Sequence, residues 1–147
     1  MLRKLYFFLL FFLTSCQFLI KNPPPSLSWP LKNQVINQKF APIWNSSHQG
    51  IDLKAQLGTP VFSSHSGRVI YAGQRFSGYG KVVIVEFSNY WSSLYAHLNE
   101  IKVQEGQTVK QGALIGTVGR TGKVTGVHLH FELIYKKQPV NPLLYLK

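Results

Sequence analysis

The stretch Gly126-Val127-His128-Leu129-His130-Phe131-Glu132 decides the fold, because it has the pattern of a single β-strand with two different faces. Alternate side chains of a strand share a face, so His128 and His130 point the same way. The apolar residues between and beside them then point into a core. The two imidazoles either lie exposed on the sheet or form a metal ligand and a catalytic group held side by side. The pattern alone leaves both interpretations open.

The composition predicts one all-β domain. A chain of 147 residues suffices for one ordinary domain. Aromatic residues make up 14%, with 12 glycines and 8 prolines, and no segment after residue 40 shows a sustained helical period. Turn residues separate the predicted elements, which are a strand or hairpin over 27–36, strands over 58–62, 67–72, 81–87 and 91–98, and a hairpin over 105–116.

The amino terminus predicts export and lipidation. Residues 1–15 carry Arg3 and Lys4 before a short apolar run, as in a secretory signal, and the run is too short for a membrane-spanning helix. Cys16 is the only cysteine, so it forms no intramolecular disulfide. Leu13-Thr14-Ser15-Cys16 resembles the bacterial lipobox; the alternative is an ordinary cysteine near a cleavage site. Lipid on Cys16 would anchor the protein to a membrane.

The predicted organisation is therefore a signal peptide over 1–15, a lipidated Cys16 with a proline-rich linker over 16–27, and a domain over 28–147. The net charge of +11 favours an anionic partner, which outside the cytoplasm means cell-wall polymer or lipid headgroups. The basic residues are scattered, with no run longer than Lys136-Lys137, so we expect no nucleic-acid partner. We expect the protein in the cell envelope, facing the wall or periplasm.

Two further segments place histidines where they can act. His48 precedes Asp52 by four residues around Gly50, so the pair either caps a turn or supplies two ligands to one metal ion. His97 lies two residues after Tyr95 on a predicted strand, so we expect the two to share a face, and His97 is either a sheet histidine or part of a site. His65, in a serine- and glycine-rich turn, is expected to be solvated.

In order along the chain, these motifs resemble the lysostaphin/LytM-type zinc metallopeptidases. The similarity covers about residues 28–143 and includes the glycine motifs around Gly58, Gly80 and Gly119. It implies a small, mostly antiparallel all-β domain of the duplicated hybrid motif fold, in a sheet or a sandwich, with the site in a groove. It also implies one Zn²⁺ held by His48, Asp52 and His130, with His97 and His128 as the catalytic histidines.

The resemblance implies an endopeptidase that cleaves stem or cross-bridge peptides of peptidoglycan. Zinc would lower the pKa of a water molecule towards ~7, and His128 would take its proton. His97 would either donate to the oxyanion or orient the water. One alternative is a LytM-like scaffold that activates another wall hydrolase, and a protein that regulates the groove is a further candidate partner. A biotinyl or lipoyl carrier would need a modifiable hairpin lysine, and Lys110 lacks the flanking pattern.

Overall fold

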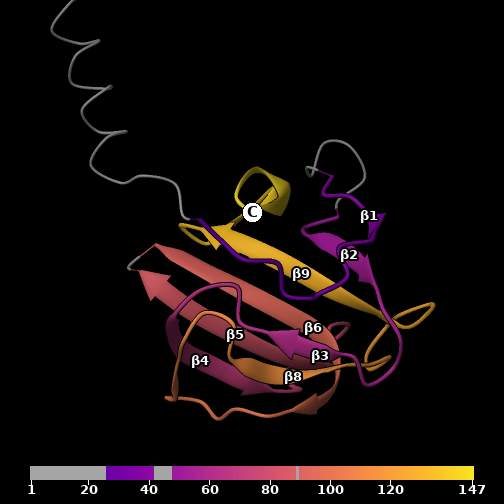
Figure 1. Ribbon diagram of the computed structural model, residues 1–147. Coiled ribbons are helices and arrows are strands. Elements are labelled where there is room, and N and C mark those ends of the chain that lie inside the picture. The colour runs from indigo at the N-terminus through magenta and orange to yellow at the C-terminus, as the bar shows by residue number, and fades with distance from the viewer. Residues whose placement is uncertain (1–25, 42–47, 89) are drawn as a thin grey trace, which may run out of the picture.

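Ten strands form one continuous antiparallel sheet in the computed structural model, which describes residues 26–41, 48–88 and 90–147 (Figure 1). The predicted signal peptide and Cys16 lie outside the described residues, so export and lipidation stay predictions. The strands are β1 (Ile36–Gln38), β2 (Ile51–Lys54), β3 (Pro60–Phe62), β4 (Gly67–Gly73), β5 (Lys81–Ser88), β6 (Trp91–Ile101), β7 (Thr108–Val109), β8 (Leu114–Val118), β9 (His128–Tyr135) and β10 (Gln138–Val140).

The predicted all-β class is confirmed. Among the described residues the single helical element is a 3₁₀ turn, η1 (Pro142–Leu144), which follows β10. None of the described residues form a helix with the length and apolar character needed to cross a membrane.

Strand β9 lies at the centre of the fold. The main order is β1-β2-β9-β6-β5-β4-β7, and β10 also pairs with β9. Strand β6 divides its pairing: residues 91–96 pair with β9, and residues 98–101 pair with β8. His97 lies at this division with φ 61°, a left-handed conformation that is uncommon for a residue other than glycine. The change of partner from β9 to β8 therefore occurs at His97, a predicted site residue.

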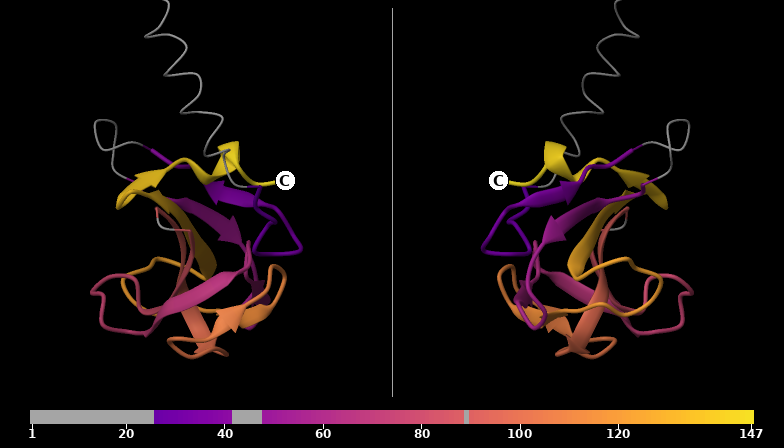
Figure 2. Two further views of the ribbon diagram at one scale, coloured as in Figure 1. Left: turned by 90° about the vertical axis from the view of Figure 1, so that its left-hand side faces the viewer. Right: turned by 90° about the vertical axis from the view of Figure 1, so that its right-hand side faces the viewer.

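The sheet is curved (Figure 2), and the main core cluster lies on its inner face, whereas a smaller buried cluster of Val82, Leu94 and Ala96 lies on the outer face. Tyr95 and Phe131 are fully buried on the inner face, and their rings lie 5.2 Å apart. Val61 of β3 and Ile115 of β8 belong to the same core cluster and are fully buried, so these two strands cover the inner face. Burying this apolar surface is the main force that holds the strands together.

Two predicted elements differ in the structure. Strands β7 and β8 of the expected 105–116 hairpin pair with other strands: β7 with β4, and β8 with β3 and β6. The amide of Gly106 donates to the carbonyl of Val69, which draws this segment onto β4. Gly112, at φ 79°, then turns the chain away before β8 begins.

The predicted strand or hairpin over 27–36 is mostly irregular. Bends occupy residues 30–33, and the first strand, β1, begins only at Ile36. Pro30 lacks the amide that a strand ladder requires. Leu27 and Leu31 are nevertheless buried in the core, and Leu27 bridges to Leu146, so the two ends of the described domain meet.

Candidate metal and catalytic site

Strand β2 delivers Asp52 to the outer face of the sheet. Ile51 and Leu53 are fully buried on the inner face, so the carboxylate between them points the other way. Asp52 is the direct cross-strand partner of His130 on β9. Gly50 allows this close pairing, since a Cβ at that position would lie 2.3 Å from the carbonyl oxygen of Phe131. These residues therefore hold the Asp52 carboxylate beside His130.

His48 points its Nε2 at the same carboxylate. It lies just before β2, and its Nδ1–H donates to the carbonyl of Lys39 over 2.9 Å. A carbonyl oxygen only accepts, so in the neutral ring the Nε2 atom carries a lone pair. That lone pair lies 3.1 Å from Oδ1 of Asp52, which is also an acceptor. Two acceptors at this distance require a cation or a proton shared between them.

His130 repeats this arrangement from the opposite side. Its Nδ1 lies 2.8 Å from Oδ1 of Asp52, and its Nε2 donates to Oε1 of Glu132 over 3.0 Å. Burial lowers the pKa of His130, but its bonds to the Asp52 and Glu132 carboxylates outweigh burial and raise the pKa to about 9. The space between His130 and Asp52 therefore attracts positive charge.

The pKa of Asp52 reflects the same electrostatics. Burial raises it, but the hydrogen bond and charge of His130, followed by the charges of His128 and His48, lower it below its usual value. Ligand atoms of His48, Asp52 and His130 all lie within 4.8 Å of one another. Two imidazole nitrogens and a carboxylate oxygen are ligands that zinc prefers, so this donor set fits a metal ion.

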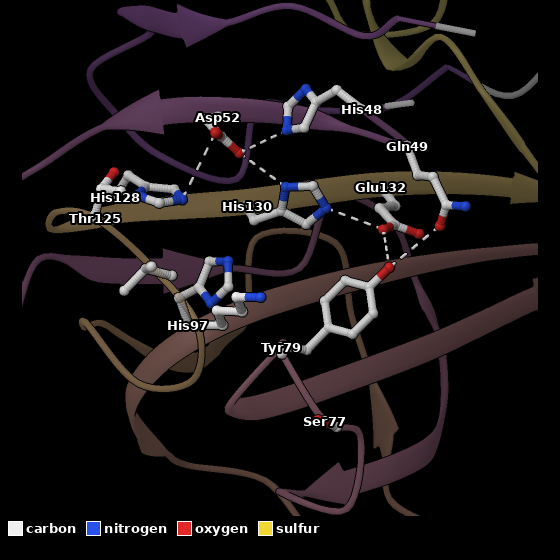
Figure 3. Close-up of a pocket in the computed structure, with 13 residues that line it drawn as sticks. His48, Gln49, Asp52, Ser77, Tyr79, His97, Thr125, His128, His130 and Glu132 are labelled. Atoms are coloured by element: carbon white, nitrogen blue, oxygen red, sulfur yellow. Dashed lines mark hydrogen bonds and ion pairs between the residues drawn. The ribbon is translucent and has the colours of Figure 1, made fainter. Parts of the chain in front are cut away.

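His128 lies one strand period from His130 on the same face of β9. Its Nδ1–H donates to the carbonyl of Gly126 over 3.1 Å, which leaves the Nε2 lone pair free in the neutral ring. This Nε2 lies 3.7 Å from Oδ2 of Asp52 (Figure 3). The ring thus borders the cluster of His48, Asp52 and His130 and is not one of its three members.

His97 reaches the site from β6. Its Nδ1–H donates to the carbonyl of Thr121 over 2.9 Å, and its ring centroid lies 4.9 Å from that of His128. Burial lowers its pKa to about 4, despite the hydrogen bond to Thr121. His97 is therefore a neutral imidazole whose Nε2 accepts rather than donates. The predicted shared face of Tyr95 and His97 is wrong: Tyr95 is buried in the core, whereas His97 lines the cavity on the outer face, and the positive φ of His97 marks the break in alternation.

The structure brings all five predicted site residues together. His48, Asp52, His97, His128 and His130 line one cavity of about 410 Å³ on the outer face of the sheet (Figure 3).

Glu132 and Tyr79 were not predicted as site residues. Glu132 is 3% exposed, and the hydroxyl of Tyr79 donates to its Oε1 over 2.6 Å. Burial, and then Glu132, raise the pKa of Tyr79 above its usual value, so its hydroxyl keeps the proton that it donates. Glu132 could have been identified because it follows His130 by one strand period. Tyr79 lies in a glycine turn, and no spacing links it to the site.

His65 is not solvated as expected. It is 5% exposed, its ring centroid lies 3.8 Å from that of Phe87, and its Nε2 lies 2.7 Å from Oγ of Ser93. Burial lowers its pKa to about 4, although a hydrogen bond to the backbone of Ser66 acts the other way. This turn packs against the apolar inner face of the sheet, so His65 belongs to the core and not to the site.

Comparison with known proteins agrees with this geometry. Residues 46–142 match peptidase family M23. The chain is 37% identical over 134 residues to the cell division protein DipM of Caulobacter vibrioides, covering 87% of this chain and 22% of that protein. It is 38% identical over 125 residues to the murein hydrolase activator NlpD of Escherichia coli, covering 85% and 32%. The lipoprotein NlpD/LppB homolog of Pseudomonas aeruginosa is 41% identical over 119 residues, covering 81% and 39%. The chain thus spans less than two fifths of each of these relatives.

Two solved structures have the same fold. A zinc-containing peptidase from Vibrio cholerae superposes with a TM-score of 0.73 at 30% identity, covering 80% of this chain and 39% of that chain. Lysostaphin from Staphylococcus simulans superposes with a TM-score of 0.73 at 29% identity, covering 84% and 53%. The family match covers most of the domain, and the ordered motifs lie in one cavity. The chain therefore belongs to peptidase family M23.

Proposed function

We propose that this protein is a zinc-dependent endopeptidase that hydrolyses peptide bonds in the stem or cross-bridge peptides of peptidoglycan. The observation that carries the proposal is the convergence of His48, Asp52 and His130, whose possible ligand atoms all lie within 4.8 Å of one another. Such a set suits one Zn²⁺ and leaves a coordination position open. When bound, zinc supplies Lewis acidity and lowers the pKa of water towards ~7.

His128 is proposed as the general base. Its Nδ1–H is committed to the Gly126 carbonyl, so Nε2 is free to take a proton beside Asp52. The resulting imidazolium then carries a proton that it can return to the leaving amine.

His97 is proposed to orient the attacking water. Its Nδ1–H is held by Thr121, and its lowered pKa keeps the ring neutral, so Nε2 accepts a hydrogen bond. Of the two roles considered for His97, this tautomer favours orienting the water over donating to the oxyanion.

The cellular setting follows from the chain and its relatives. A signal peptide and lipidated Cys16 would hold the domain at an envelope membrane, and one relative bears the name lipoprotein. The basic chain suits an anionic wall polymer.

A second candidate function is supported by the name of the Escherichia coli relative, which is a murein hydrolase activator. In that case the groove would bind another hydrolase and cleave nothing. The complete donor set and the two adjacent histidines favour catalysis.

Digestion of purified peptidoglycan distinguishes the two functions. The proposal expects new peptide fragments, identified by mass, that disappear with a chelator and return with added Zn²⁺. An activator would release no fragments alone but would increase release by an added wall hydrolase. Absence of fragments with zinc-loaded protein would contradict the peptidase proposal.

A further inference from the structure

The outer face of the sheet continues beyond the metal site. On β9 the strand period that places His130 and Glu132 on this face also places Ile134 there, and the strand then ends at the Lys136 turn. Leu94 and Ser92 of β6 are the cross-strand partners of Glu132 and Ile134. At ~3.3 Å per residue, Lys136 lies about 20 Å along the strand from His130. Residues of this face therefore run along β9 from the site to this turn, beside a buried stretch that includes Leu94.

A second cavity, of about 500 Å³, opens at that end. Among the residues that line it are Ile70, Tyr90, Trp91, Ile134, Lys136 and Lys137. Ile70 is 42% exposed and Tyr90 is 53% exposed, so apolar and aromatic surface is open to a ligand. The two lysines give this cavity a positive rim.

The positive charge is available for binding. The ammonium of Lys136 lies 5.3 Å from the ring centroids of both Tyr90 and Tyr135. Within the described parts of the chain, neither Lys136 nor Lys137 forms an ion pair. The carboxylate among the lining residues is Glu86, so the two lysines outnumber it.

The turn that carries the lysines has an unusual backbone conformation. Lys136 and Lys137 have φ values of 48° and 64°, and they join the paired residues Tyr135 and Gln138 in a two-residue hairpin. Such a turn favours Asn-Gly, so two lysines there are not explained by turn preference. The amide of Lys136 also donates to the carbonyl of Tyr90 over 2.8 Å, which joins the turn to the start of β6 (Figure 1).

We infer that this cavity, which we call the Lys136 subsite, binds a carboxylate of the peptide substrate at a distance from the bond held at the metal site. An extended peptide spans 3.3–3.6 Å per residue, so about six residues cover the 20 Å between the two places. Lysine ammonium groups attract a carboxylate, while Tyr90 and Ile70 contact apolar parts of the chain. This inference rests on the proposed function, whose substrate it extends.

An anionic membrane is the other class of partner that lysines suit. Lipid recognition usually involves clusters of four to eight basic residues, and here there are two beside a carboxylate. The cavity is also lined by Ile134, which shares its strand face with His130 and Glu132. Both observations favour the peptide.

The test compares peptide binding with and without the ligand carboxylates. Cross-linked stem-peptide dimers are prepared with free carboxylates or as amides, and binding to the full chain is measured by calorimetry with chelator present, so that nothing is cleaved. The variant Lys136→Asn/Lys137→Gly removes both charges and keeps a favoured turn. The control Lys32→Gln/Lys110→Gln removes two exposed lysines elsewhere.

We expect the wild type and the control to bind the free carboxylate form about 5-fold more tightly than the amide, with the preference shrinking at high salt. The turn variant should show no preference, with an unchanged thermal midpoint or a higher one. A preference that persists in the turn variant, or no binding of either form by the wild type, would overturn the inference. The inference would also be overturned if the turn variant lost binding to vesicles of anionic lipid but kept its preference for the free carboxylate peptide, since the lysines would then bind a membrane. Cleavage is measured separately with zinc, so its absence contradicts the proposed function and not the subsite.

Discussion

Replacing Glu132 with glutamine should weaken zinc binding although Glu132 is not one of the three proposed ligands. Its carboxylate accepts the Nε2–H of His130 at 3.0 Å and is 3% exposed, so water does not replace it easily. This bond fixes the tautomer that leaves Nδ1 of His130 facing Asp52. The glutamine amide keeps the shape of the side chain but removes its charge.

The expected magnitude follows from the type of contact that is lost. Groups that orient a metal-binding histidine typically contribute 10- to 100-fold in metal affinity, which is about 1.4 to 2.8 kcal/mol. Tyr79→Phe removes one hydrogen bond to Glu132 and leaves the carboxylate, so its effect should be only a few-fold. The loss of zinc affinity should therefore be larger for Glu132→Gln than for Tyr79→Phe.

Competition with a chromophoric chelator measures both affinities. Glu105→Gln, an exposed carboxylate in the turn before β7, is the matched control and should bind zinc as the wild type does. Zinc affinity of Glu132→Gln equal to that of the wild type would refute the reasoning that Glu132 orients His130.

Three further predictions concern single residues. His128→Ala should keep zinc and lose about 10²- to 10⁴-fold in peptidoglycan cleavage, whereas His130→Ala should lose both; elemental analysis and cleavage assays measure this, and a zinc-free His128→Ala would contradict it. Gly50→Ala should destabilise the fold by about 1–3 kcal/mol in urea unfolding, since its Cβ would meet the Phe131 carbonyl at 2.3 Å, and an unchanged midpoint would refute this. The lowered pKa of His65 means that folding favours its neutral ring, so its contribution to the free energy of unfolding is complete above pH ~6.5 and falls by about 3 kcal/mol as the pH drops to ~4. The variant His65→Gln should flatten this part of the plot of unfolding free energy against pH, and parallel plots for variant and wild type would disprove it.

Strand alternation predicted much of the site. The period of two placed His128 and His130 on one face, and the buried neighbours Ile51 and Leu53 left Asp52 on the outer face, as the structure confirms. The roles of these residues came from the family resemblance, because both histidines satisfy the geometry of a ligand.

Other features depended on contacts between distant segments, which local patterns do not encode. The segment over 105–116 has the composition of a hairpin, but β4 and β6 offered partners for its two halves. Tyr79 reaches Glu132 across 53 positions. Burial of His65 depended on the apolar surface of Phe87, which its own serine-rich turn does not predict.

The position of β9 determines how late in synthesis the candidate site can form. This strand lies between β2 and β6 but comes late in the chain, and it closes contacts such as Asp52 to His130 that span 78 positions. Long-range pairing of this kind is slow and comes late in folding. A chain synthesised only as far as β8 therefore has neither a complete sheet nor the cluster of His48, Asp52 and His130. The proposed peptidase activity would require synthesis through β9, so a shorter nascent chain would be inert.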